Sequence, residues 1–116
     1  MRIEIRGRNV EVTDELREHV LKRFRRIGRQ VSELATLDVE LHEERNPSIE
    51  DCQVAEATLR LKGVTLRASE SSPEMHHTIH ELAEDIRRQV KKHRELRRKR
   101  SQTRKAVGQL RGRPAS

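Results

Sequence analysis

Apolar residues in this chain recur in two different periods, and these periods constrain the fold more than any other feature. In residues 2–6 and again in 37–42, apolar and polar residues alternate, which is typical of half-buried β-strands. From Asp14 to Gln30, and from Ser72 to about Arg100, apolar residues recur every three or four positions, as in helices that pack one face on a core. Only 32% of the residues are apolar and 39% are charged, so we expect a thin core under a charged surface.

Two more alternating segments lie between the helical ones. Residues 55–61 place Ala and Leu at every second position, and Lys62-Gly63 then provides a tight turn into a shorter strand at 64–68. The segment 43–51 is predicted to be a loop, and 69–72 is polar. Ser72-Pro73 is a good start for the second helix, because serine caps helices and proline suits the first helical position.

The resulting order is β-α-β-β-β-α, which predicts an α+β fold with a four-stranded sheet and two parallel helices on one face. A helical crossover makes the first two strands parallel, and two hairpins then reverse the chain direction twice. Each helix runs back against the strand before it, so the C-terminal halves of both helices should lie at the same end of the molecule. We expect one domain at residues 1–100 and a disordered basic tail at 101–116, which lacks apolar periodicity.

Positive charge is concentrated in the last quarter of the chain. Residues 1–85 hold 13 Lys and Arg against 18 Asp and Glu, whereas residues 86–116 hold 13 against Glu95 alone. A concentrated cationic surface attracts polyanions through counterion release, and Arg matches phosphate geometry well. Nucleic acid is therefore the leading partner.

The two predicted helices both carry such cations on their C-terminal halves. The candidate RNA-binding residues are Lys22, Arg23, Arg25, Arg26 and Arg29 on the first helix and Arg87, Arg88, Lys91, Lys92, Arg94 and Arg98 on the second. The alternative is that these cations only form a solvated surface and complement the negative ends of the helix dipoles. However, both helices carry several cations, and the second has only one acid near them, so there are more cations than the dipoles require. Because Phe24 is the only aromatic residue, binding should read phosphates and shape more than bases.

Other functional classes fit the sequence less well. The basic stretch lacks the bulky apolar groups of a membrane-surface helix, so we expect no membrane partner. His76, His77 and His80 could supply two metal ligands from one helix face, which leaves a metal-dependent enzyme as a remote alternative. No nucleophile elbow or phosphate loop occurs, so we expect no enzyme, no cofactor, no metal and no small-molecule substrate. A single cysteine, Cys52, and the absence of a signal-like start favour the cytoplasm.

Two segments carry a family resemblance. Residues 3–17, IEIRGRNVEVTDELR, and residues 87–94, RRQVKKHR, resemble the ribosome hibernation promoting factor and ribosome-associated inhibitor A family of bacteria and plastids. The similarity covers roughly residues 1–96 and includes the order of elements. The chain departs from the family at Pro73-Glu74-Met75-His76, where an acidic-Met-Tyr signature is usual, and at Asp85, where lysine is common.

The resemblance implies a translation inhibitor that docks on the small ribosomal subunit and its ribosomal RNA in resting or stressed cells. It implies occupation of the channel used by messenger and transfer RNA, with RNA contacts from Lys22, Arg23, Arg26, Arg87, Arg88, Lys91, Lys92 and Arg94. The long form of the family adds a C-terminal dimerisation domain, and this chain resembles the short form without it. A general structured-RNA binder or a ribosome assembly factor remains the alternative.

Overall fold

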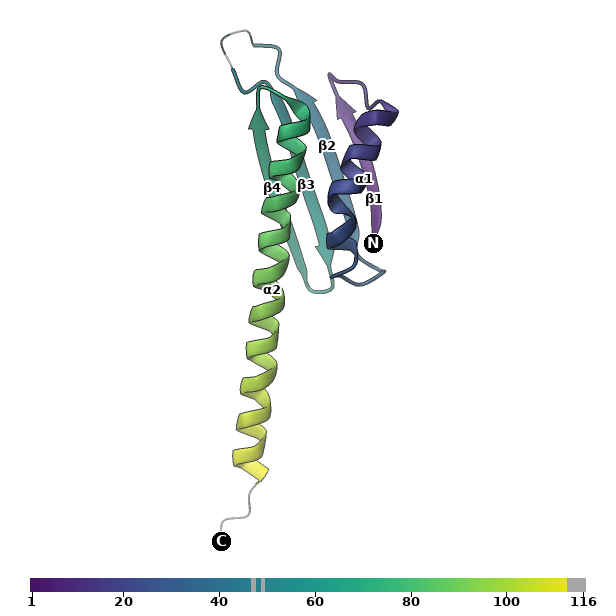
Figure 1. Ribbon diagram of the computed structural model, residues 1–116. Helices are drawn as coiled ribbons and strands as arrows, with labels where there is room; N and C mark the ends of the chain where they lie inside the picture. Colours follow the sequence, from purple (N-terminus) through teal and green to yellow (C-terminus); the bar gives the residue numbers. More distant parts are fainter. Residues whose placement is uncertain (47, 49, 113–116) are drawn as a thin grey trace.

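The computed structural model describes residues 1–46, 48 and 50–112. The elements follow in the order β1 (Arg2–Arg8), α1 (Asp14–Gly28), β2 (Thr36–Glu43), β3 (Gln53–Leu61), β4 (Val64–Ser72) and α2 (Met75–Gly112). Figure 1 shows the strands side by side in one layer with both helices on the same face. The predicted α+β fold is therefore confirmed.

The sheet has the order β1-β2-β3-β4, with β1 parallel to β2 and the two later pairs antiparallel. The register aligns Ile3, Leu37, Leu59 and Leu66 in one row across all four strands. Because side chains alternate between faces, this row and its equivalents form the face under the helices. The other face, which we call the open face, carries polar side chains such as Arg6 and Glu56.

The core lies between the sheet and the two helices. The fully buried apolar side chains of the helices are Val20, Phe24 and Ile27 of α1 and Ile79, Leu82, Ile86 and Val90 of α2. They match the three-and-four spacing of the sequence, so each helix buries one stripe. At the start of α1, the Thr13 hydroxyl accepts a hydrogen bond from the Leu16 N–H at 3.2 Å, which caps the helix.

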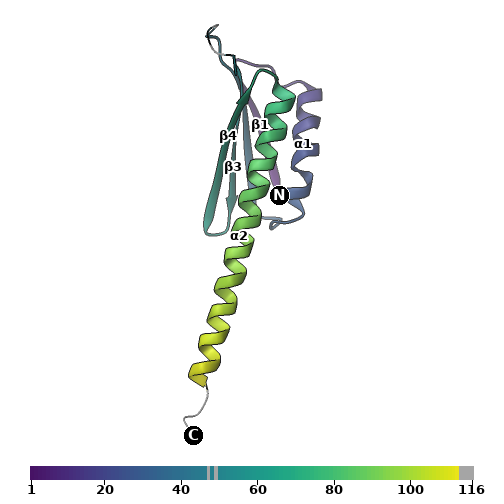
Figure 2. The same ribbon diagram turned by 60° about the vertical axis from the view of Figure 1, so that its left-hand side comes forward.

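Both helices run in the same direction, away from the β2–β3 loop (Figures 1 and 2). This follows from the topology, since β1, β2 and β4 point one way and each helix returns across the sheet. The basic C-terminal half of α1 and the middle of α2 therefore lie at one end of the sheet, beside the β3–β4 turn. At that turn Gly63 adopts a φ of +80°, which a residue with a side chain rarely does.

Strand β4 is longer than its sequence pattern predicts. We expected it to end at Ala68, but pairing with β3 continues through Ser72, opposite Gln53. The last residue of the strand, Ser72, is polar and buried, but its hydroxyl is hydrogen-bonded: Ser72 Oγ lies 2.5 Å from Thr78 Oγ1. Backbone pairing with β3, rather than side-chain pattern, sets the end of this strand.

Helix α2 differs from the prediction at both ends. It begins at Met75 rather than beside Pro73, and the Glu74 carboxylate accepts hydrogen bonds from the N–H groups of His76 and His77 at 3.1 and 3.0 Å. It continues to Gly112, whereas the sequence pattern predicted a disordered tail from residue 101 onward. Arg, Lys, Gln and Ala are good helix formers, so this segment extends the helix without an apolar stripe. Residues 113–116 of the predicted tail lie outside the described residues.

Candidate nucleic-acid interface

Helix α1 presents its five cations on two different arcs. All five are exposed, as the sequence predicts. Arg23 and Arg26 are three residues apart and line a groove between α1 and α2. The remaining three, Lys22, Arg25 and Arg29, fall by helical spacing on the arc away from the core. The helix therefore offers one cationic group beside α2 and another directed outward.

On α2, four of the candidate cations form a single line. Arg87, Lys91, Arg94 and Arg98 follow one another at steps of four, three and four, so they share one side of the helix. We call these four residues the basic stripe. Its side of the helix is the one toward α1, since Arg87 lines the groove with Arg23, and Arg94 lines a pocket with Gln30. Cations of both helices thus meet along one surface.

A groove lies on this surface between the two helices. It has a volume of about 270 Å³, and its walls are Arg23, Arg26 and Ile27 from α1 with Ala83, Glu84 and Arg87 from α2. Arg87 Nη2 lies 2.9 Å from the Glu84 carboxylate, and this hydrogen-bonded ion pair holds the pKa of Glu84 below its usual value. Of the candidate cations in the described ranges, only Arg87 is ion-paired, which leaves Arg23 and Arg26 able to meet phosphate.

Toward the C-terminal end of α1, the structure adds cations that sequence reasoning missed. Lys62 of the β3–β4 turn and Arg97 of α2 line the same pocket as Arg94. The sequence could predict the position of Lys62 in part, because a turn between antiparallel strands must lie at one end of the sheet. It could not predict that Lys62, Arg94 and Arg97 line one pocket, because this depends on how three separate elements pack together.

The last candidate on α2, Arg98, is exposed, as are Lys99 and Arg100. Figure 1 shows the helix continuing past the β3–β4 turn as a single projecting rod. The molecule is accordingly long and narrow, with extents of 74 × 29 × 18 Å.

Arg88 and Lys92 lie on a different side of α2 from the basic stripe. They are exposed, but each has an acidic neighbour by helical spacing: Asp85 lies three residues before Arg88, and Glu95 three residues after Lys92. Burial, followed by a hydrogen bond to the Asp85 carboxyl, raises the pKa of Glu70 on the adjacent strand. The positive potential at Arg88 and Lys92 is thus partly offset by local acids.

The first histidine of α2, His76, is engaged with protein groups. His76 lies 3.1 Å from Glu74 and 3.3 Å from Glu15, and its ring meets that of His19 edge to face at 4.6 Å. Within residues 1–46, 48 and 50–112, no group of three or more His, Cys, Asp or Glu side chains is placed to hold a metal ion. The alternative of a metal-dependent enzyme therefore gains no support from this geometry. No helix of the described chain is long and apolar enough to cross a membrane.

Comparison with known proteins agrees with this architecture. The family model described as sigma 54 modulation protein / S30EA ribosomal protein matches residues 3–98. Ribosome hibernation promoting factor of Pseudomonas putida is 33% identical over 95 residues, covering 82% of this chain and 88% of its own. The protein of the same name from Acinetobacter guillouiae is 29% identical over 101 residues, covering 83% and 89%.

A solved structure has the same fold as this chain. The N-terminal domain of Thermus thermophilus Protein Y superposes with a TM-score of 0.69 and 27% identity, covering 79% of this chain and 98% of that domain. The family match spans the whole sheet, α1 and the part of α2 that packs on the sheet. The chain therefore belongs to the sigma 54 modulation protein / S30EA ribosomal protein family, the family of the ribosome hibernation promoting factors.

Proposed function

We propose that this chain is a cytoplasmic translation inhibitor that binds ribosomal RNA of the small subunit through the facing surfaces of α1 and α2. Bound there, it occupies the channel that messenger and transfer RNA use. Inhibition then needs no chemistry, because an occupied channel admits no other RNA. The protein would thus inhibit translation by blocking the channel and not by catalysing a reaction.

The observation that carries this proposal is the meeting of two cationic helices at one end of the sheet. Arg23 and Arg26 of α1 face the groove that Arg87 shares, and the basic stripe continues from there along α2. Structured RNA presents closely spaced phosphates, and each cation that replaces a condensed counterion adds affinity. The family match supports the ribosome as the source of that RNA.

The lack of base-reading groups explains why the target would be defined by shape. No tyrosine or tryptophan occurs in the chain, and Phe24 is buried in the core. Phosphate contacts carry no sequence information, so specificity must come from the arrangement of RNA segments around the two helices. A ribosomal channel offers such a fixed arrangement, which free RNA lacks.

Sedimentation of extract from cells that produce the tagged chain tests this proposal. We expect the protein to travel with small subunits and whole ribosomes, and purified protein to block synthesis in a cell-free translation reaction. Distribution over RNA of all sizes, without inhibition of translation, would favour a general structured-RNA binder or an assembly factor instead.

A further inference from the structure

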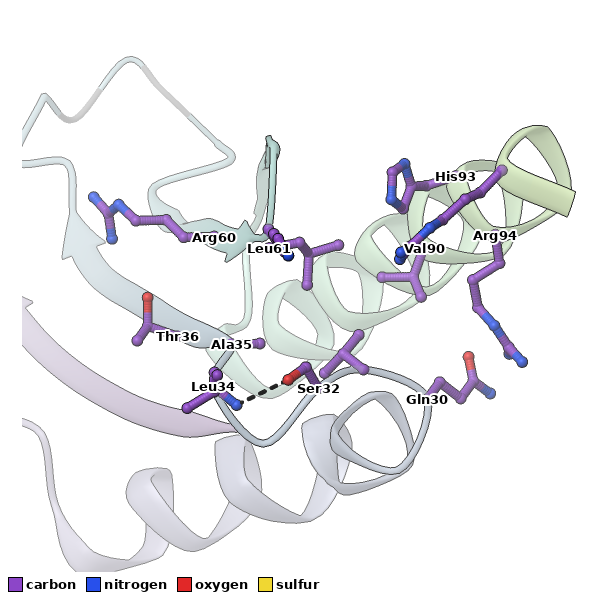
Figure 3. Close-up of a pocket in the computed structure, with 13 residues that line it drawn as sticks. Gln30, Ser32, Leu34, Ala35, Thr36, Arg60, Leu61, Val90, His93 and Arg94 are labelled. Atoms are coloured by element: carbon purple, nitrogen blue, oxygen red, sulfur yellow. Dashed lines mark hydrogen bonds between the residues drawn. The ribbon is translucent and has the colours of Figure 1, made fainter. Parts of the chain in front are cut away.

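A pocket of about 590 Å³ lies at the basic end of the molecule, where three elements meet. It is enclosed by the α1–β2 loop, the end of β3 with its turn, and α2 (Figure 3). Its floor is apolar: Val90 is fully buried, and Leu61 and Val31 are half-buried. Figure 3 shows Leu61 and Val90 on facing sides of this space. The volume falls within the roughly 300–1,000 Å³ that small-molecule sites occupy.

One wall of the pocket is an apolar side chain exposed to solvent. Leu34 is 91% exposed, the highest value among the large apolar residues of the described chain. The loop that carries it is held in place, since the Ser32 hydroxyl accepts a hydrogen bond from the Leu34 N–H at 3.1 Å. An exposed leucine beside the apolar floor extends the apolar surface that a ligand can cover.

The rim of the pocket is cationic. Lys62, Arg94 and Arg97 line it, and no Asp or Glu of the described chain does. Arg60 is also present, but it forms an ion pair with Asp38 on the open face, and Figure 3 shows its side chain directed away from α2. His93 adds a half-buried imidazole beside the floor. The positive charge of the rim favours a ligand with a negative group, and the apolar floor favours a ligand that also has an apolar surface.

We propose that this pocket binds one unpaired nucleotide of the RNA, with its base on the apolar floor and its phosphate at Lys62, Arg94 and Arg97. A nucleotide combines a planar, weakly polar base with an adjacent anion, which is the combination that floor and rim demand. Unstacked bases pack on imidazole rings and guanidinium planes, and His93 and Arg94 supply both. Gln30 adds a side-chain amide beside Arg94, where a base edge could meet it.

This inference rests on the proposed RNA-binding function and adds to it a contact that is not ionic. The cations of the two helices hold phosphates and carry no preference for unpaired positions. The pocket would favour a place in the RNA where a base is already turned out of its helix. It would therefore help to set where on the RNA the protein docks.

Methyl nuclear magnetic resonance on the full chain tests the inference directly. Adenosine monophosphate and uridine monophosphate should shift the methyl signals of Val31, Leu34, Leu61 and Val90, with dissociation constants of order 1 mM for so small a contact. Ribose 5-phosphate and inorganic phosphate should leave these signals in place, and neither nucleotide should shift the methyls of Leu21, which lies outside the pocket. Equal shifts with ribose 5-phosphate, or none with either nucleotide, would overturn the inference. So would tighter binding of a Glu- and Leu-rich peptide at these methyls.

A substitution separates this inference from the proposed function. Leu34→Ser should weaken ribosome binding several-fold without changing its salt dependence, because the lost contact carries no charge. The exposed side chain supports no packing, so the fold should be unaffected. Leu21→Ser, at a leucine that is 39% exposed on α1 outside the pocket, is the control; its fold is checked by circular dichroism, and it should bind as wild type. If Leu34→Ser binds as wild type, the pocket is not used while the proposed function stands. If the unaltered chain does not bind ribosomes, the proposed function itself fails.

Discussion

Single residues in this protein show how tertiary contacts change what local sequence suggests. Glu70 looks like an ordinary surface carboxylate in a polar segment. In the structure it lies on the helix-covered face of β4, where burial and a hydrogen bond to the Asp85 carboxyl raise its pKa above the ordinary 4.5. Two carboxyl groups this close cannot both ionise without cost. Only the pairing of β4 with α2 brings them together, so no local pattern predicts it.

The raised pKa has a definite effect on stability. A carboxyl with a higher pKa in the folded state binds its proton more tightly there, so its ionisation opposes folding as pH rises above 4.5. Glu70→Gln should therefore increase the free energy of unfolding at neutral pH, and this gain should vanish in acid below 4.5. Urea unfolding at both pH values measures it, with exposed Glu33→Gln as a neutral control. A loss of stability at neutral pH would show that the Glu70 carboxylate is favourably held.

At the scale of elements, the sequence predicted the structure wherever packing and periodicity coincide. The stripe of Val20, Phe24 and Ile27 defines α1, and the alternation at 37–41 defines β2, because each element buries one face. The far end of β4 and the extension of α2 were missed, since backbone pairing in one and intrinsic helix propensity in the other act without an apolar pattern. The shared basic end followed from topology, but the pocket at Lys62 and Arg97 depends on three elements meeting.

The extension of α2 should contribute to binding but not to folding. Residues 94–103 are exposed, so deleting 101–116 should leave the melting temperature nearly unchanged while reducing the helical circular dichroism signal. Ribosome affinity should fall moderately through loss of Arg104, Lys105, Arg111 and Arg113. A melting temperature lower by many degrees would mean that the deleted segment packs on the domain.

The start of α2 should be separable from the binding surface. His76 and His77 lie in the first turn, at the end of the helix far from the basic stripe, with His80 one turn on. Changing all three to Gln should leave inhibition of cell-free translation within about a factor of two of wild type, since no contact to phosphate is removed. Complete loss of inhibition, with the fold intact by circular dichroism, would return a metal site or direct RNA contact at these histidines to consideration.

The whole molecule separates its charges in space. Positive charge on α1 and α2 collects on the helical side of one end, whereas the open face carries ion pairs such as Arg8 with Glu40 and Arg60 with Asp38. A net charge of +7 could attract RNA to any side. Binding through the facing helices instead confines the RNA to one surface, and the two possibilities differ in a measurable way.

The salt dependence of ribosome binding for two variants of equal charge separates them most directly. One variant changes the four residues of the basic stripe, Arg87, Lys91, Arg94 and Arg98, to Gln, and the other changes Arg2, Arg6, Arg8 and Arg67 on the open face to Gln. Gln forms helices nearly as well as Arg, and the exposed ion pairs lost in either variant contribute about 0–1 kcal/mol each, so both should fold. In the helix variant, the slope of log affinity against log salt should fall by up to about four units, and translation should recover in parallel. The open-face variant should keep the wild-type slope and inhibition. Equal losses in both variants would contradict a binding surface on the helices and leave only attraction by net charge.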